Sequence, residues 1–231
     1  MMLLSESDAS RLIHSASDLT SFLECEALTA LNLQALRDPD LAAKRIPPDE
    51  GTRLVAEKGI AHEKSYLQLL RDQGKRVIDI AQVAGRDNQK RLAATRQAMA
   101  DGLDIVYQAA LGQENLMGHA DFLIRVPAPS SLGDWSYEVA DTKLALSAKA
   151  KFLVQMSFYG QLLTPEQGLA PQQMHVVLGD QKIATYHCSD YDFYVRALLD
   201  RYLLAVEQLQ QGARQPAYPL PCAHCAMCDW R

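Results

Sequence analysis

Residues 103 to 144 read LDIVYQAALGQENLMGHADFLIRVPAPSSLGDWSYEVADTKL. This stretch holds three short runs rich in apolar and aromatic residues, separated by clusters of Gly, Pro and Ser: Leu103 to Leu111, Glu114 to Val126, and Trp135 to Leu144. Short apolar runs bounded by such residues are typical of sheet strands. We therefore expect three consecutive strands in this part of the chain.

Helical patterns surround these strands. Apolar periodicity and capping residues predict helices over 17–36, 49–73, 88–100, 149–163 and 190–211, and three more strands over 77–80, 174–178 and 182–186. The alternation of helices with a strand meander and a later strand pair predicts an α/β fold, with a mixed central sheet flanked by helices.

Length and composition limit the possible organisation. With 231 residues, of which 48% are hydrophobic, the chain can bury one substantial core. We expect a single domain over 1–231, in which the 17–36 helix carries Cys25, a core spans 49–211 and a cysteine segment spans 212–231. No leader-like or membrane-length segment is evident, so we expect a cytoplasmic protein without a membrane partner. The net charge of -5 means that a nucleic acid would need a local basic patch.

Two acidic residues fall on neighbouring predicted strands. Asp121 follows Gly118 in a G-x-x-D pattern, and Asp141 precedes Lys143 in a D-x-K pattern. Because side chains alternate along a strand, Asp141 and Lys143 share one face. Carboxylates can hold Mg²⁺ or Mn²⁺, which polarises a phosphate and lowers the pKa of an attacking water. A nearby lysine can orient that water and stabilise developing charge. Taken singly, Asp121 and Asp141 would more often be carboxylates at a strand end or in a turn, and Lys143 a solvated residue at a sheet edge.

Two helices offer further polar groups. His62, three residues after Gly59, is a candidate imidazole ligand, with Glu63 as the spare candidate. Gln155 and Tyr159 are four residues apart and therefore share a helix face, from which both can contact phosphate or support the lysine. A surface histidine and core aromatics are the ordinary alternatives.

Three cysteines, Cys222, Cys225 and Cys228, recur at every third position near the end of the chain. This spacing indicates a soft-metal or iron–sulfur site, with Cys25 as a fourth ligand; four thiolates, or three with His224, also suit Zn²⁺. A bond between Cys25 and this cluster would close a loop over nearly the whole chain, which removes on the order of 5 kcal/mol of unfolded-state entropy. The remaining cysteine, Cys188, is most simply a small core residue.

Together the motifs resemble the RecB-like branch of the PD-(D/E)xK nucleases, over about residues 17–230. The resemblance rests on the order of four motifs: G-x-x-H (Gly59, His62), G-x-x-D (Gly118, Asp121), D-x-K (Asp141, Lys143) and Q-x-x-x-Y (Gln155, Tyr159). It implies a restriction-endonuclease-like core that cleaves DNA, as an exonuclease at single-stranded ends, with Mg²⁺ or Mn²⁺ at His62, Asp121, Asp141 and the backbone carbonyl of Thr142. It also implies catalytic roles for Lys143, Gln155 and Tyr159.

The cysteines resemble the iron–sulfur staple of the AddB-type and CRISPR-adaptation nucleases of that branch. The resemblance implies a structural [4Fe-4S] cluster at Cys25, Cys222, Cys225 and Cys228, and a helicase or RNase-H-like region in the same or a partner chain. Two departures stand out. Asp141 occupies a position where Glu is commoner, and the related pattern places a cysteine beyond Arg231. The fourth ligand is therefore Cys222 or, if the chain is a fragment, a residue beyond its end.

Two other classes of function stay open at this point. A non-catalytic nucleic-acid-binding or scaffold module would keep the nuclease fold and a structural zinc or iron–sulfur site. A redox-sensing iron–sulfur protein would show cluster-dependent binding without hydrolysis.

Overall fold

The computed structural model describes residues 2–4 and 11–230. The chain divides into two compact units, the first made of Met1–Ala56 with Phe193–Arg231 and the second of Glu57–Asp192. Helices α4 (Glu50–Asp72) and α8 (Ser189–Gln210) contribute residues to both units. Within the described residues, no helix combines the length and the apolar character that crossing a membrane requires.

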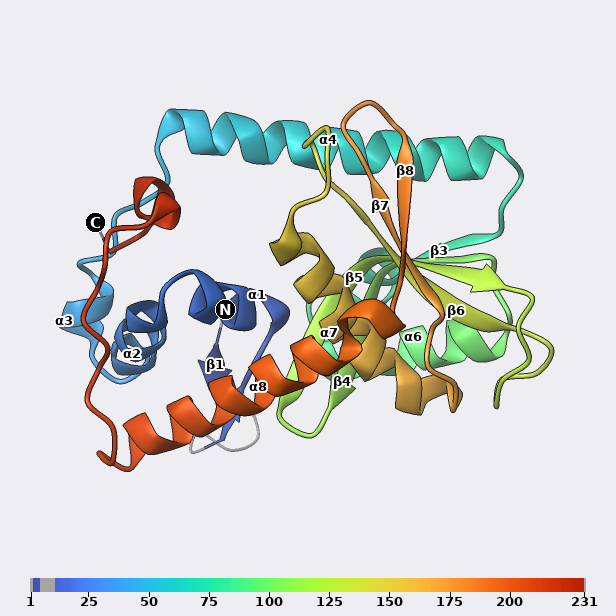
Figure 1. The fold of residues 1–231 in the computed structure, drawn as a ribbon. Helices are drawn as coiled ribbons and strands as arrows, with labels where there is room; N and C mark the ends of the chain where they lie inside the picture. The colour runs from blue at the N-terminus through green and yellow to red at the C-terminus, as the bar shows by residue number, and fades with distance from the viewer. Residues whose placement is uncertain (1, 5–10, 231) are drawn as a thin grey trace. The chain divides into compact units, whose positions relative to one another are not determined.

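The second unit is built on a mixed sheet of six strands (Figure 1). In spatial order these are β3 (Val77–Asp79), β4 (Ile105–Gln113), β5 (Leu116–Val126), β6 (Ser136–Thr142), β7 (Gln173–Val177) and β8 (Ile183–His187). The pairs β3–β4 and β6–β7 are parallel, and the other neighbours are antiparallel. The predicted α/β fold with a mixed sheet flanked by helices is confirmed.

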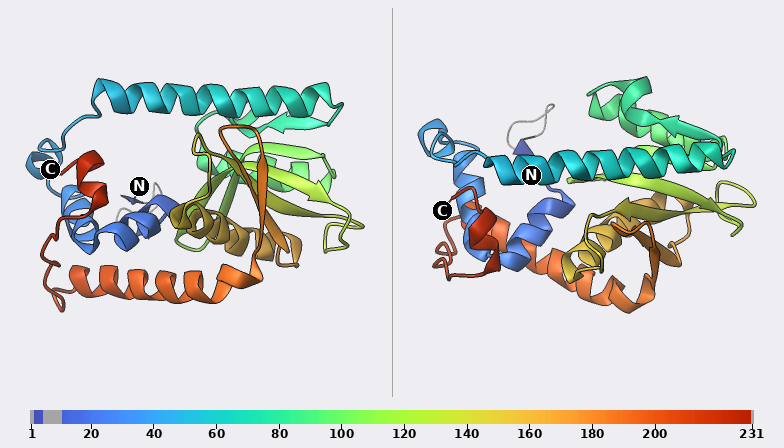
Figure 2. Two further views of the ribbon diagram at one scale, coloured as in Figure 1. Left: turned by 45° about the horizontal axis from the view of Figure 1, so that its top comes forward. Right: turned by 90° about the horizontal axis from the view of Figure 1, so that it is seen from above.

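Helices cover both faces of this sheet. Besides its parts of α4 and α8, the second unit contains the helices α5 (Ile80–Ala84), α6 (Asn88–Ala100) and α7 (Ala150–Gln167). Val177 belongs to a core cluster with Tyr66 of α4, whereas Met174 on the same strand meets Ser157 of α7. Because successive side chains of a strand point to opposite faces, α4 and α7 lie on opposite sides of the sheet. Figure 2 shows this layering from two further directions.

Strand β6 is buried along its whole length. A strand covered on both faces needs apolar residues, yet this strand carries two acids, Glu138 and Asp141. Glu138 contacts the ring of His175 at 2.9 Å and accepts the backbone N–H of Gln173 at 3.0 Å. A buried charge without a partner is costly, so Asp141 must also have a polar partner in the fold.

The first unit is mainly helical. It contains α1 (Ala16–Glu24), α2 (Glu26–Ala35), α3 (Pro39–Ala42), a short 3₁₀ helix η1 (Ala223–Met227) and the antiparallel strands β1 (Leu3–Leu4) and β2 (Leu12–Ile13). The ring of Tyr202 in α8 packs edge-on against Phe22 at 5.5 Å between centroids. Its hydroxyl is 2.8 Å from Nδ1 of His14.

The sequence predicted that Cys25 lies inside a helix, but in the structure it lies between two helices. Its backbone is extended, with φ −159° and ψ 108°, and it separates α1 from α2. A continuous helix would place Glu26 on the same face as the buried Phe22. With the break, Ala27 becomes buried, and Glu26 pairs with Arg214 at 2.6 Å.

Candidate active site

Asp121 and Asp141 face each other where the pairing of β5 with β6 ends. The last paired residues are Phe122 and Ala140, so the next position along these antiparallel strands sets Asp121 against Asp141. The backbone N–H and the hydroxyl of Thr142 donate to Oδ2 of Asp121 at 3.2 and 3.3 Å. Sheet register alone therefore brings the two predicted carboxylates together.

Burial makes this acidic pair hard to ionise. Asp141 is 1% exposed, and burial raises its pKa. Burial, and then the charge of Asp141, raise the pKa of Asp121 to about 7. The ammonium of Lys143 contacts Oδ2 of Asp141 and opposes both shifts. One ammonium group thus faces two acids in a setting of low dielectric, where a divalent cation would favour full ionisation of both.

Lys143 directly follows β6, and its backbone continues the pairing of β6 with β7. Its backbone N–H donates to the carbonyl of Val177 at 2.9 Å, and its Nζ lies 5.3 Å from the centre of the Phe152 ring. The side chain is 22% exposed, so the ammonium is within reach of solvent. The contact with Asp141 confirms that the D-x-K residues share one face.

Gln155 and Tyr159 of α7 join the same site. Nε2 of Gln155 donates to the Tyr159 hydroxyl at 2.9 Å. Burial, and the charges of Asp141 and Asp121, raise the pKa of Tyr159. A Cβ atom at Gly118 would lie 2.6 Å from a ring carbon of Tyr159. The glycine of the G-x-x-D pattern is therefore required for α7 to approach β5.

His62 lies at the same end of the sheet. Its Nε2 is 3.4 Å from the carbonyl oxygen of Val177, the atom that also accepts the N–H of Lys143. The neighbouring residue, Glu63, interacts electrostatically with Asp121 and Lys143. Helix α4 thus presents both a histidine and a carboxylate at this end of the sheet.

The predicted cluster ligands lie in the first unit. The sulfur atoms of Cys222 and Cys225 are 3.9 Å apart, and Cys25 lines a pocket of about 290 Å³ together with Cys222. The sulfur of Cys228 instead accepts the backbone N–H of Trp230 at 3.4 Å. All are free thiols. The donors suit a thiophilic metal in type, and the structure brings two of the four sulfurs, those of Cys222 and Cys225, close together. Cys188 is buried, as predicted.

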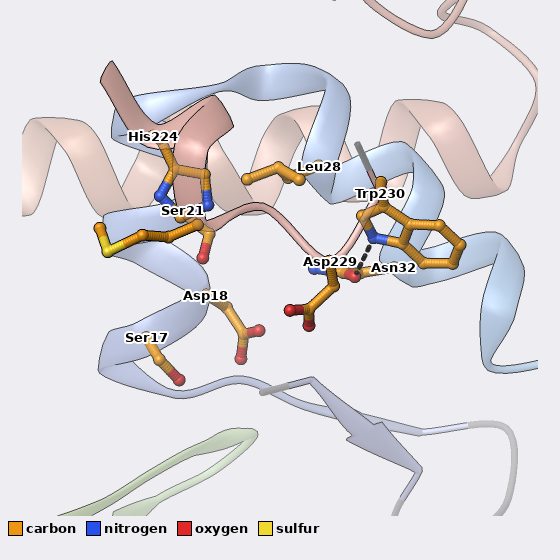
Figure 3. Close-up of a pocket in the computed structure, with 9 residues that line it drawn as sticks. Ser17, Asp18, Ser21, Leu28, Asn32, His224, Asp229 and Trp230 are labelled. Carbon is orange, nitrogen blue, oxygen red and sulfur yellow. Dashed lines mark hydrogen bonds between the residues drawn. The ribbon is translucent and has the colours of Figure 1, made fainter. Parts of the chain in front are cut away.

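The cysteine segment is also attached to the first unit by contacts that involve no sulfur. Nε1 of Trp230 donates to Oδ1 of Asn32 at 3.1 Å (Figure 3), and the backbone N–H of Ile46 donates to the carbonyl of Asp229 at 2.8 Å. His224 contacts Glu24 at 2.7 Å. A pocket of about 230 Å³ lies between this segment and helices α1 and α2. These contacts attach the segment to helices α1 and α2 and to the chain after α3.

Among the described residues, no group of three or more His, Cys, Asp or Glu side chains is arranged to hold a metal ion. In the second unit two carboxylates converge, and their oxygens are hard donors of the kind that Mg²⁺ and Mn²⁺ prefer. No family profile matches this chain, and no curated protein is significantly similar to it. The cation, the cluster and the nuclease family thus stay predictions.

Sequence reasoning missed two neighbours of the site on β4. Tyr107 and Gln108 both hydrogen-bond to Glu63, with 2.5 Å between Nε2 of Gln108 and Oε1 of Glu63. The sequence does contain a signal for Gln108. Apart from Tyr107, it is the one residue with a polar side chain in the apolar run Ile105 to Leu111. A polar residue in a strand that packs on both faces indicates a partner in the fold.

Proposed function

We propose that this chain is a metal-dependent nuclease of the RecB-like type, which hydrolyses DNA phosphodiesters as an exonuclease at single-stranded ends. The observation that supports this proposal is the pair Asp121–Asp141, of which Asp121 is half-buried and Asp141 buried, with Lys143 in contact. Two ionised acids opposite one another in a largely buried setting are unfavourable unless cations neutralise them. Hard cations held by carboxylates, with an ammonium group beside them, can supply the electrostatic stabilisation that metal-dependent phosphodiester hydrolysis uses.

Each residue then has a role. Asp121 and Asp141 would hold Mg²⁺ or Mn²⁺, with His62 and the carbonyl of Thr142 as the further predicted ligands. The bound ion would polarise the phosphate and lower the pKa of a water molecule. Lys143, which is partly exposed, would donate to the phosphate oxygens as charge develops. Gln155 orients the Tyr159 hydroxyl, which can donate to the substrate from the α7 side.

The cysteines have a structural role in this proposal. Cys25, Cys222, Cys225 and Cys228 would hold a [4Fe-4S] cluster, or Zn²⁺ as the alternative, that ties the two ends of the chain together. A cytoplasmic location and a helicase or RNase-H-like partner region belong to the same proposal. Iron and zinc analysis of anaerobically purified protein would identify the metal.

The test compares two D-x-K pairs of the same chain. Asp141 pairs with Lys143 in the core, and Asp180 pairs with Lys182 at 2.6 Å in the exposed turn after β7. Labelled single- and double-stranded DNA would be incubated with Mg²⁺, Mn²⁺ or EDTA. We expect Asp141→Ala to lower the metal-dependent cleavage rate by roughly 1,000-fold or more, and Asp180→Ala to leave it unchanged.

Two results would count against the proposal. Cleavage by Asp141→Ala at the wild-type rate in Mn²⁺ would show that the site is elsewhere. A wild-type protein that binds DNA but cuts it under none of these conditions would favour the non-catalytic binding module. Circular dichroism of both variants tests whether the fold is retained.

A further inference from the structure

Strand β4 has an unusual backbone conformation beside the acidic pair. Gln108 has φ 54°, a left-handed conformation that costs a non-glycine residue on the order of 1 kcal/mol or more. Its neighbours Tyr107 and Ala109 pair with Phe122 and Ala120 of β5. Gln108 therefore lies directly across from Asp121, at a point where the ladder is interrupted.

The conformation of Gln108 directs its side chain to Glu63. The side-chain amide donates to Oε1 of Glu63 at 2.5 Å. Tyr107, the preceding residue, also hydrogen-bonds to this carboxylate. Two consecutive residues of β4 thus hold one carboxylate from α4, which is half-buried.

Glu63 lies beside the acidic site. Gln108, which binds its carboxylate, is opposite Asp121 on β5, and Glu63 interacts electrostatically with Asp121 and Lys143. The polar contact of His62, by contrast, is with the backbone of Val177.

We infer that Glu63 is a further residue of the proposed cation site, supplying an oxygen donor from α4 beside Asp121 and Asp141, and that Gln108 is the residue that positions it. This inference rests on the proposed function. It explains why β4 adopts a strained conformation at a polar residue in an apolar run: an extended Gln108 would lose its bond to Glu63. Acting through Glu63, Gln108 touches neither metal nor substrate.

The test measures binding of Mn²⁺ alone, by calorimetry and by the electron paramagnetic resonance signal of the free ion. We expect Glu63→Gln to weaken Mn²⁺ binding by at least about 10-fold, and Gln108→Gly by up to about 10-fold. Glu57→Gln is the matched control, because Glu57 lies on the exposed part of the same helix. Its Mn²⁺ affinity should equal that of the wild type.

The glycine variant separates positioning from a structural role. Glycine adopts a left-handed conformation without strain, so Gln108→Gly should keep or raise the melting temperature while Mn²⁺ affinity falls. An affinity within twofold of the wild type for Glu63→Gln would overturn the inference. So would loss of affinity in His62→Gln but not in Glu63→Gln. A wild-type protein that binds no Mn²⁺ would instead mean that the proposed function itself has failed.

Discussion

The acidic pair of the second unit and the cysteine segment of the first are both predicted metal sites, but they are built differently. Asp121 and Asp141 adjoin the last paired residues of two central strands, Phe122 and Ala140, and their approach needs no ion. The cysteine segment has a single turn of 3₁₀ helix, and three of its contacts are with α1, α2 and the chain after α3. Its sulfur atoms are exposed or partly exposed.

Metal binding is expected to contribute to folding at only one of these two sites. A sheet holds its ligands in register by backbone hydrogen bonds, so a cation there mainly relieves charge repulsion between groups that are already in place. In a segment with little backbone pairing, the metal itself must bring the ligands together, and its binding energy becomes folding energy. Loss of metal should therefore affect the first unit far more than the second.

The largest expected effect concerns Cys25. In protein that retains its metal, Cys25→Ser should lower the stability of the first unit by up to about 5 kcal/mol, because a loop over most of the chain is no longer closed. Hydrogen exchange should become faster in peptides covering 16–35 and 215–230, and stay unchanged in 105–142. The same substitution in chelator-treated protein is the control and should have little effect. Wild-type exchange in the metal-bound variant would show that Cys25 is no ligand.

A smaller effect distinguishes the glycines of two motifs. Gly118→Ala would push a methyl group into the ring of Tyr159, and we expect a loss of about 1–3 kcal/mol in the free energy of unfolding. At Gly59 in α4 nothing lies within 4 Å of an added Cβ, so Gly59→Ala should be neutral or stabilising by up to about 1 kcal/mol. Urea unfolding measures both. Equal destabilisation by the two substitutions would contradict the close approach of α7 to β5.

The last comparison concerns pH dependence, which has opposite signs in the two units of chelator-treated protein. Burial lowers the pKa of His14, so the unfolded chain binds a proton at a higher pH than the folded chain does. The first unit therefore loses stability as the pH falls below about 6.5. Asp121 has the opposite sign: its pKa rises from 3.8 to about 7, so the second unit loses stability as the pH rises across that interval. Each slope is at most about 1.4 kcal/mol per pH unit.

The two tryptophans allow the units to be followed separately, since Trp230 lies in the first unit and Trp135 in the second. Urea unfolding of each single-tryptophan variant would be measured by fluorescence between pH 5 and 8. His14→Gln should flatten the slope of the first unit, and Asp121→Asn that of the second. Slopes of the same sign in both units would contradict the assignment.

Most of the fold could be predicted from local patterns. The strands of the meander and the helices at 49–73 and 88–100 appear within a few residues of their expected limits, because apolar periodicity reports which face of an element is buried. The break at Cys25 could not be predicted in this way. It depends on Glu26 finding Arg214, a partner almost two hundred residues away. The left-handed Gln108 likewise depends on Glu63, which another element supplies.

The residue types and the period at which apolar residues repeat in each run can be read directly from the chain. From these follow the strands, the helices and the shared face of Asp141 and Lys143, since all are local consequences of backbone geometry. The tertiary structure is needed to see that Asp121 meets Asp141, that Tyr159 packs against Gly118 and that Glu63 interacts with Asp121. Those contacts depend on strand register and helix packing. Both result from many weak interactions between distant segments, so neither can be recognised in the sequence of one segment alone.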